Sequence, residues 1–276
     1  MFDLPEPPPY SLANAPLAQA LAQVRYPLIA DFESMAGIAP LQRELRSHFP
    51  YMQQEKVQEF NFVAGPAGPS ASAAESVTWN LTDDSGHLVV IGASSATLSV
   101  GETYSGFEDF VTVFARLLRA LEKVGIPRCD RLGARYLSLA PEIPTETQSW
   151  RKWFKPEIIG WSGAGFIGDQ TTLASVSQTQ LNHLMDESPP FPGNLQAVVR
   201  HGAVPAGTSI PGIPPLNVSA PSYMLDIDVF VESHQKFEPE QIVEQFTLFH
   251  SEIDRFFYWS LTVEGGEHFG LSIRDS

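Results

Sequence analysis

A repeated order of segments limits the folds open to this chain more than any other feature of its sequence. Two long helical patterns, at residues 107–124 and from Pro239 past Phe257, each close a series of strand-like runs. Each series opens with a strand followed by a short helix, and the opening strands share letters, VRYPLI at residues 24–29 and ARYLSL at residues 134–139. The order β-α-β-β-β-α therefore occurs twice, which predicts an internal duplication.

The duplication predicts a division of the chain into three segments. Residues 1–16 form a Pro-rich leader, residues 17–127 the first half and residues 128–276 the second half. We expect an α+β fold in which the antiparallel strands of both halves form one curved sheet, with the long helices packed on a face. A tandem of separate ferredoxin-like modules is the alternative. Within the second half, a Pro/Gly-rich loop at residues 204–221 predicts an exposed connection.

Local patterns place the individual elements. In the helix at residues 107–124, Ser105 and Glu108 fit a capping box and Gly125 supplies the stop. Its apolar stripe comprises Phe107, Phe110, Val111, Phe114, Leu117, Leu118 and Leu121. The stripe of the last helix comprises Ile242, Phe246, Phe249, Ile253 and Phe256.

The remaining elements are shorter. A short helix is expected to begin near Pro40, and a second, aromatic one to end at Pro156. Residues 65–75 consist mostly of small side chains and predict a loop, whereas residues 87–100 predict one strand. Alternation over residues 223–231 predicts a half-buried strand.

The composition narrows the classes of partner. Lys and Arg total 17 against 32 Asp and Glu, a net charge of -15, so broad binding to nucleic acid is disfavoured. Cys129 is the single cysteine, which excludes an internal disulfide and fits a reducing compartment. The N-terminus lacks a signal-peptide pattern, and no apolar run is long enough to span a membrane. We therefore expect a soluble cytoplasmic protein with no membrane partner.

Several phrases, in order, resemble a known family. They are NAPL at residues 14–17, HFP at residues 48–50, the run from Leu98 to Phe110, RLGARYLSL at residues 131–139, and the C-terminal run from Leu225 to Phe257. Together they resemble a family of sporadically distributed, uncharacterised prokaryotic proteins of about this length. The family usually has Asn where this chain has Ser138. The resemblance brings no established activity, cofactor or catalytic residue. The patchy occurrence of the family implies an accessory or mobile-element role, together with a neighbouring gene product or in defence.

Two motifs associated with enzymes lack the structural context that their chemistry needs. Gly163, Gly165 and Gly168 spell G-x-G-x-x-G, but no strand precedes them and no helix follows, as a dinucleotide site requires. Ser162 lies in a near match to a nucleophile elbow and lacks the same context. A loop is the simpler interpretation of both.

The sequence offers pairs of possible metal ligands but not the three or four that a metal site needs. His250 and Asp254 would share a helix face, and Asp226 and Asp228 a strand face, but two ligands do not make a metal site. A solvated face or a salt bridge is the simpler interpretation. We expect neither a metal nor a cofactor.

Four residues are candidates for ligand binding. Trp150 and Trp153 lie among basic residues, a composition that can bind single-stranded nucleic acid or simply form a core with a basic edge. Arg25 and Arg135 are equivalent under the duplication. Each needs an acceptor within an apolar strand, either a sheet carboxylate such as Asp226 or an anionic ligand.

These observations favour a non-enzymatic protein that binds an unknown protein partner or a small anionic ligand. The alternative is an enzyme or a nucleic-acid-acting component of a mobile-element or defence module, with its site along the basic, aromatic segment.

Overall fold

The computed structural model describes residues 2–65, 68–163, 174–183, 193–210, 216 and 218–274, with only the backbone described at residues 57–65 and 68–75. Its class is α+β, as predicted. The chain divides into two compact units. One comprises Met1–Ala20, Gly133–Val231 and Gln245–Ser276, and the other comprises Leu21–Leu132 and Glu232–Glu244.

Among the described residues, nine strands form one sheet in the order β3-β4-β5-β6-β2-β7-β10-β9-β8, and β1 pairs with β11 in a second, two-stranded sheet. This agrees with the prediction of one large antiparallel sheet and not with two separate modules. The strands are β1 Tyr10–Leu12, β2 Leu17–Arg25, β3 Tyr51–Gly65, β4 Gly68–Thr82, β5 His87–Ile91, β6 Ser95–Val100, β7 Arg128–Pro141, β8 Ser177–His183, β9 Leu195–Val204, β10 Ser222–Lys236 and β11 Leu271–Ile273.

Within the described ranges, five α-helices lie between groups of these strands along the chain. They are α1 Met35–Leu45, α2 Phe107–Lys123, α3 Pro156–Ile159, α4 Pro239–Ser260 and α5 Val263–His268, with single-turn 3₁₀ helices at Ala30–Glu33, Ser149–Lys152 and Gly160–Gly163. None of the helices in the described part of the chain is both long and apolar enough to cross a membrane.

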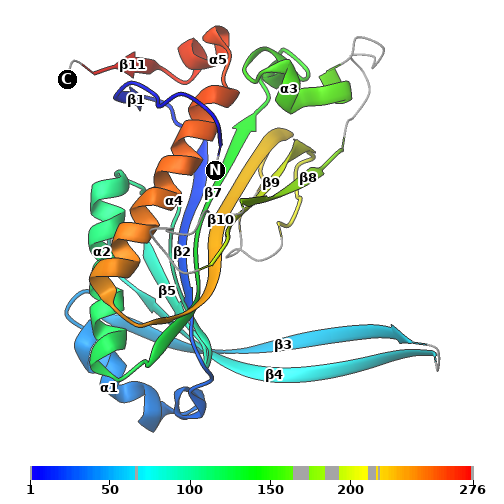
Figure 1. Ribbon diagram of the computed structural model, residues 1–276. Coiled ribbons are helices and arrows are strands. Elements are labelled where there is room, and N and C mark those ends of the chain that lie inside the picture. Colours follow the sequence, from blue (N-terminus) through cyan, green and yellow to red (C-terminus); the bar gives the residue numbers. More distant parts are fainter. Residues whose placement is uncertain are drawn as a thin grey trace. The chain divides into compact units, whose positions relative to one another are not determined.

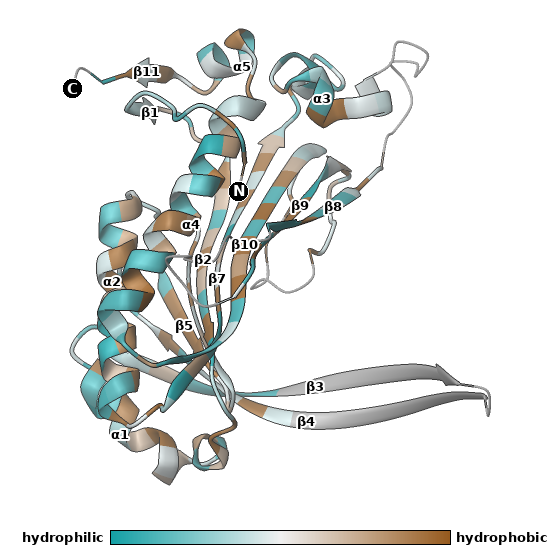
Figure 2. Cartoon of the chain, in the orientation of Figure 1, coloured by the Kyte–Doolittle hydropathy of each residue, from teal (hydrophilic) through white to brown (hydrophobic). Residues whose placement is uncertain are grey.

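The two long amphipathic helices confirm the pattern read from the sequence. In α2 the stripe through Phe110, Phe114, Leu117, Leu118 and Leu121 is buried, and in α4 Ile242, Phe246, Phe249 and Ile253 are buried. Figure 2 shows hydrophobic residues recurring along α4 and along β7 and β10. Gly125 ends α2 with φ 88°, a left-handed conformation that glycine adopts without strain.

Helix boundaries differ from the sequence predictions in three places. Gly106 precedes α2 without a side-chain cap, because the Ser105 hydroxyl donates to Asp109 at 2.6 Å and the expected capping box does not form. Pro40 lies inside α1, whose amino end is capped by Ser34 instead. Pro156 begins α3 rather than ending a helix, a position where its missing N–H costs nothing.

The first half contains one strand more than predicted. Residues 87–100 form two strands, β5 and β6, joined by a turn in which Gly92 N donates to Ser95 O at 2.8 Å. The small-residue run at residues 68–75 is not a loop, since it belongs to β4 and pairs with β3 along a long hairpin (Figure 1). The first half is therefore β-α-β-β-β-β-α, while the second half, β7 to α4, keeps the predicted order.

In the unit that contains both termini, the N-terminal segment is bound to α4. The ring centroids of Phe2 and Phe256 lie 4.7 Å apart, and the Tyr10 hydroxyl donates to Asp254 Oδ1 at 2.6 Å. Pairing of β1 with β11 joins the two ends of the chain. The Pro-rich leader is thus part of the folded structure.

Candidate functional site

A charged cluster is buried in the sheet formed by β7, β10 and β9. Arg135 on β7 donates to both carboxylate oxygens of Asp226 on β10, from Nε at 2.7 Å and from Nη2 at 2.8 Å. Arg200 on β9 donates to the same carboxylate from Nη1 at 3.2 Å. The Asp226 side chain is 0% exposed, against 15% for Arg135 and 30% for Arg200. The salt bridge predicted between Arg135 and a sheet carboxylate is therefore present.

Strand pairing explains why these three charges meet. Asp226 and Arg200 are directly opposite each other in the register of β10 and β9, so their side chains share a face. For Arg135, burial lowers the pKa, but the hydrogen bond and charge of Asp226, with the charge of Asp228, outweigh burial and raise it. The guanidinium thus stays charged inside the fold.

A cavity of about 390 Å³ opens over this cluster. Arg135, Arg200 and Asp226 line its polar side, and Thr208 and Ser209 lie at another wall. The remaining lining is apolar: Val176, Val204, Ile210 and Met224. We call this cavity the Asp226 pocket. It combines an apolar enclosure with a few converging polar groups, which is the usual composition of a small-molecule site.

One wall of the Asp226 pocket depends on a glycine. Gly202 on β9 has φ +150°, and a Cβ there would lie 1.8 Å from the Ser175 carbonyl oxygen. This close approach lets Ser175 N donate to Ala203 O at 2.9 Å and sets Val176 beside the pocket. A side chain at position 202 would displace that wall.

The Pro/Gly-rich stretch supplies another wall, so its interpretation as an exposed connection holds only in part for the described residues: Ala206, Gly207, Ser209, Ser219 and Pro221 are exposed, whereas Val204 and Val218 are buried. Val218 is 2% exposed and joins a core cluster with Leu137, Val204 and Met224, against which Ile210 and Leu216 pack. Gly207 N donates to Val218 O at 2.8 Å. Residues 211–215 and 217 lie outside the described residues.

This packing also changes the interpretation of the strand at residues 223–231. It was expected to be half-buried, but Tyr223, Met224, Leu225, Asp226 and Ile227 are all buried. Met224 and Asp226 point into the pocket, whose walls cover the face that alternation assigned to solvent.

Arg25 has surroundings unlike those of Arg135. It is the last residue of β2 and is exposed, and its side chain has no hydrogen bond or ion pair with another described residue. Arg135 lies well inside β7. The letters shared by the two halves therefore align the end of one strand with the interior of another, and residues 26–29 lie beyond β2.

Trp150 and Trp153 are core residues. Trp150 is 0% exposed, packs on Tyr223 at 4.8 Å between ring centroids, and donates from Nε1 to Glu142 at 3.1 Å. Trp153 is 2% exposed and stacks on His268 at 3.9 Å. Neither lines the Asp226 pocket. Stacking on a nucleic-acid base requires an open ring face, which these buried rings lack.

The enzyme-like motifs have no catalytic geometry among the described residues. Ser162 is buried in a 3₁₀ helix and donates to the Ile159 carbonyl at 2.6 Å, so it is not on a strand-to-helix elbow. Gly163 ends that helix, while Gly165 and Gly168 lie outside the described residues. No group of three or more His, Cys, Asp or Glu within the described ranges could hold a metal ion.

The two pairs weighed as metal ligands have other partners. Asp226 is bound by the two arginines. Asp254 accepts the Tyr10 hydroxyl; burial raises the pKa of this carboxyl, and the Tyr10 bond opposes the rise. The His250 ring packs beside Tyr136 at 5.4 Å, and burial lowers its pKa to about 4.

The depressed pKa of His250 predicts a pH dependence of stability. Unfolded, the imidazole has its ordinary pKa of 6.5, so only the unfolded chain takes up this proton between pH 6.5 and about 4. The stability contributed by a neutral His250 is fully present above pH 6.5. It is lost progressively as the pH falls from 6.5 to about 4. Over this window the free energy of unfolding should fall by about 3 kcal/mol more in the wild type than in His250→Leu.

Urea unfolding at pH 7 and pH 4 measures this difference. His48→Gln, which replaces a histidine at an exposed position, is the matched control. An equal loss of unfolding free energy between pH 7 and pH 4 in the wild type and in His250→Leu would contradict the prediction.

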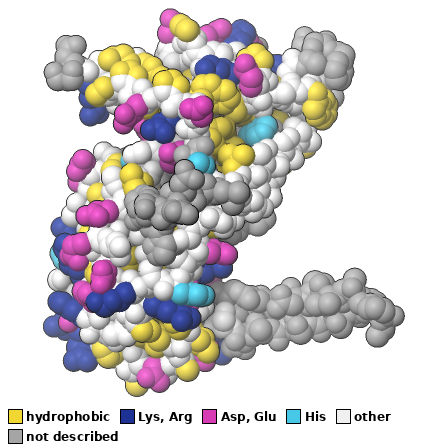
Figure 3. Space-filling view, viewed as in Figure 1, with side chains coloured by type: hydrophobic (Ala, Val, Ile, Leu, Met, Phe, Trp, Pro, Cys, Tyr) yellow, Lys and Arg dark blue, Asp and Glu magenta, His cyan; other side chains and the backbone are white. Residues whose placement is uncertain are grey.

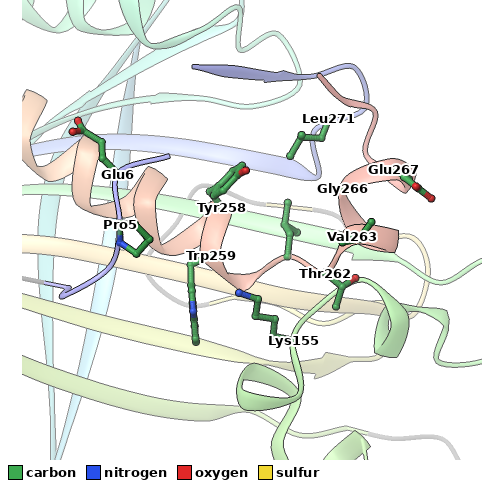
Figure 4. Close-up of a pocket in the computed structure, with 11 residues that line it drawn as sticks. Pro5, Glu6, Lys155, Tyr258, Trp259, Thr262, Val263, Gly266, Glu267 and Leu271 are labelled. Carbon is green, nitrogen blue, oxygen red and sulfur yellow. The ribbon is translucent and has the colours of Figure 1, made fainter. Parts of the chain in front are cut away.

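A second cavity, of about 420 Å³, lies in the same unit near the end of α4 (Figure 4). Its lining includes Pro5 and Glu6 of the N-terminal segment, with Trp259, Val263 and Leu271. Figure 3 shows hydrophobic side chains gathered around β1, β11 and α5. The Lys155 ammonium group lies 5.0 Å from the centroid of the Trp259 ring, a cation–π contact within the protein. Of the charged residues that line this cavity in the described part of the chain, Glu6 and Glu267 are exposed and Lys155 is half-buried, so the Asp226 pocket, with its fully buried carboxylate, is the stronger candidate site.

Sequence reasoning identified Arg135 and Asp226 but not Arg200, Thr208 or Ser209. Arg200 interrupts the apolar run LQAVV, which is a visible signal, but its partner depends on the register between β9 and β10. Thr208 and Ser209 lie in the Pro/Gly-rich stretch, whose composition suggested only exposure.

Comparison with models of protein families and with curated protein sequences finds no match to this chain.

Proposed function

We propose that this chain is a non-enzymatic binding protein that holds a small anionic ligand in the Asp226 pocket. The observation that carries the proposal is a pair of guanidinium groups that line one cavity and share a single buried carboxylate. Two positive charges against one negative charge leave the lining with an excess positive charge. An anion would compensate that charge inside a partly apolar enclosure, where the interaction is stronger than in water.

Arg200 is the residue best placed to bind such a ligand. Its Nη1 bonds Asp226 and its Nε donates to Gln178 at 2.9 Å, so the guanidinium is held in a fixed orientation. No described residue accepts a hydrogen bond from Nη2, and the side chain retains 30% exposure. A fixed, partly exposed donor loses little entropy when an anion binds.

Purification from the native cell tests the proposal. Tagged wild type and Arg200→Gln would be isolated in parallel, and the small molecules bound to each identified by mass spectrometry. We expect an anion enriched on the wild type and absent from Arg200→Gln. Arg119→Gln is the control, because Arg119 makes only an exposed contact with Glu240 at 3.5 Å. The same small molecules on wild type and Arg200→Gln would contradict an anion site at this pocket.

The alternative of a nucleic-acid-acting component has no comparable support. Its site was expected along the basic, aromatic segment, but Trp150 and Trp153 are buried. Within that segment Arg151 lies 5.7 Å from the centroid of the Trp150 ring and donates to the Ser162 carbonyl at 2.9 Å. These contacts support a structural role for the segment.

The order of strands supports an origin by internal duplication, which we also propose. The opening strands β2 and β7 are neighbours within the sheet. Outward from β2 follow β6, β5, β4 and β3, and outward from β7 follow β10, β9 and β8, so both halves are laid out in the same manner. The extra strand of the first half, β3, is at the edge, where an added strand leaves the pairing of the others unchanged.

We further propose that the chain is related to the sporadically distributed prokaryotic family and has an accessory role in the cytoplasm. The phrases from NAPL to the C-terminal run support the relationship, and a single buried thiol, Cys129, fits a reducing compartment.

A further inference from the structure

The charge of the Asp226 pocket distinguishes between classes of anion. Among the lining residues, Arg135 and Arg200 each contribute one positive charge and Asp226 one negative charge, which leaves a single net positive charge. Asp228 does not line the cavity but acts on Arg135 electrostatically, so it weakens the positive potential further. A monoanion balances the charges that line the cavity itself. A phosphate monoester carries nearly two negative charges at neutral pH and would leave one uncompensated.

The hydrogen-bond donors available in the pocket match a carboxylate in number. Arg200 Nη2 carries N–H donors that no described residue uses, and Ser209 contributes an exposed hydroxyl. These groups suffice for the two oxygens of one carboxylate. The Thr208 hydroxyl already donates to the Pro205 carbonyl at 2.6 Å, so it can accept a hydrogen bond but has no further proton to give. The three oxygens of a phosphate would remain under-bonded.

The apolar walls require an apolar body in the ligand. Val176, Val204, Ile210 and Met224 enclose the space beside the charged cluster. Acetate or another small carboxylate would leave these walls in contact with water. A chain or ring attached to the carboxylate would bury apolar surface against them, which contributes about 0.8 kcal/mol for each methylene group, or roughly fourfold in affinity.

We infer that the ligand of the Asp226 pocket is a monocarboxylate with an apolar body, bound through Arg200. This inference rests on the proposed function and names the chemical class of its ligand. The carboxylate pairs with the outer donors of Arg200 while Asp226 holds the inner ones, and the apolar body lies against Ile210, Val176 and Met224.

Calorimetric titration with a matched set of small molecules tests the inference on the full chain. Hexanoate should bind the wild type, and acetate should bind at least about tenfold more weakly because it lacks four methylene groups. Hexanol, hexylamine and hexyl phosphate should each bind at least about tenfold more weakly than hexanoate, since hexanol is neutral, hexylamine is a cation and hexyl phosphate carries nearly two negative charges.

Two variants separate the carboxylate contact from the apolar contact. Arg200→Gln should weaken hexanoate binding at least about tenfold, whereas Arg119→Gln should leave it unchanged. Ile210→Ser leaves the charged cluster intact and should reduce the preference for hexanoate over acetate. Circular dichroism of each variant establishes that it is folded before titration.

The outcomes distinguish the inference from the proposed function. Tighter binding of hexyl phosphate or inorganic phosphate, still dependent on Arg200, would overturn the monocarboxylate and leave the anion site standing. Hexanol binding as tightly as hexanoate would also overturn the inference. Failure of every anion to bind the wild type, or full binding to Arg200→Gln, would overturn the anion site and the inference together.

Discussion

Asp226→Asn is expected to lower the free energy of unfolding by about 3–5 kcal/mol, because it removes the charge that two guanidinium groups share inside the fold. The carboxylate is 0% exposed and accepts hydrogen bonds from Arg135 Nε and Nη2 and from Arg200 Nη1. Asparagine has nearly the same shape but cannot accept all of these bonds, and it leaves two positive charges facing each other. Equilibrium unfolding in urea at pH 7 measures the loss.

Glu44→Gln is the matched control for this change. Glu44 pairs with Lys123 at 2.7 Å, but both side chains are well exposed, so the substitution should cost less than about 1 kcal/mol. Arg135→Met should fall between the two variants, because Arg200 remains to pair with Asp226. A loss for Asp226→Asn no larger than that for Glu44→Gln would show that the cluster is solvated, and the Asp226 pocket would then lack its buried charge.

The sequence was informative where a local pattern determines the structure. Helices α2 and α4 were predicted correctly because a helix buries every third or fourth residue, and their apolar residues recur at that spacing. The end of α2 at Gly125 follows from a conformation that only glycine adopts readily. Such features require no knowledge of which other segment lies nearby.

The prediction failed where the structure of a segment depends on which other strand it pairs with. Residues 68–75 are Ala, Ser, Gly, Pro and Glu, a composition without strand-like periodicity, yet they pair with β3 throughout. Strand register also brings Arg200 opposite Asp226, and no local pattern specifies that register. In the Pro/Gly-rich stretch, the described residues after Val204 belong to no helix or strand, as predicted, but Ile210, Leu216 and Val218 give them enough apolar surface to pack.

The sequence therefore predicted Arg135 and Asp226 of the candidate site but not its other polar residues. An arginine within an apolar strand must have an acceptor, and that requirement pointed to Arg135 and to a sheet carboxylate such as Asp226. The same requirement did not apply to Arg25, because the strand ends at that residue and the guanidinium is in contact with water. Burial of Trp150 and Trp153 likewise depended on contacts with Tyr223 and His268, far away in the sequence.

Each long helix has a buried phenylalanine near its centre. Replacing it with alanine should lower the free energy of unfolding as much as Asp226→Asn does. Phe114 in α2 and Phe249 in α4 are both 0% exposed, so Phe114→Ala and Phe249→Ala should each lower the free energy of unfolding by about 3–5 kcal/mol. The cost combines the lost burial of the ring with the cavity left behind, since the surrounding core relaxes only partly.

Leu248 offers a control one residue from Phe249. It lies on the outer side of α4 and is 43% exposed, so Leu248→Ala should cost less than about 1 kcal/mol. Urea unfolding of Leu248→Ala and Phe249→Ala compares two truncations to the same residue on the same helix. Their difference isolates burial from helix propensity, because alanine replaces a large apolar residue in both variants. Similar losses for the two variants would mean that α4 is rotated from the orientation found here, and the contact between His250 and Tyr136 would then be wrong as well.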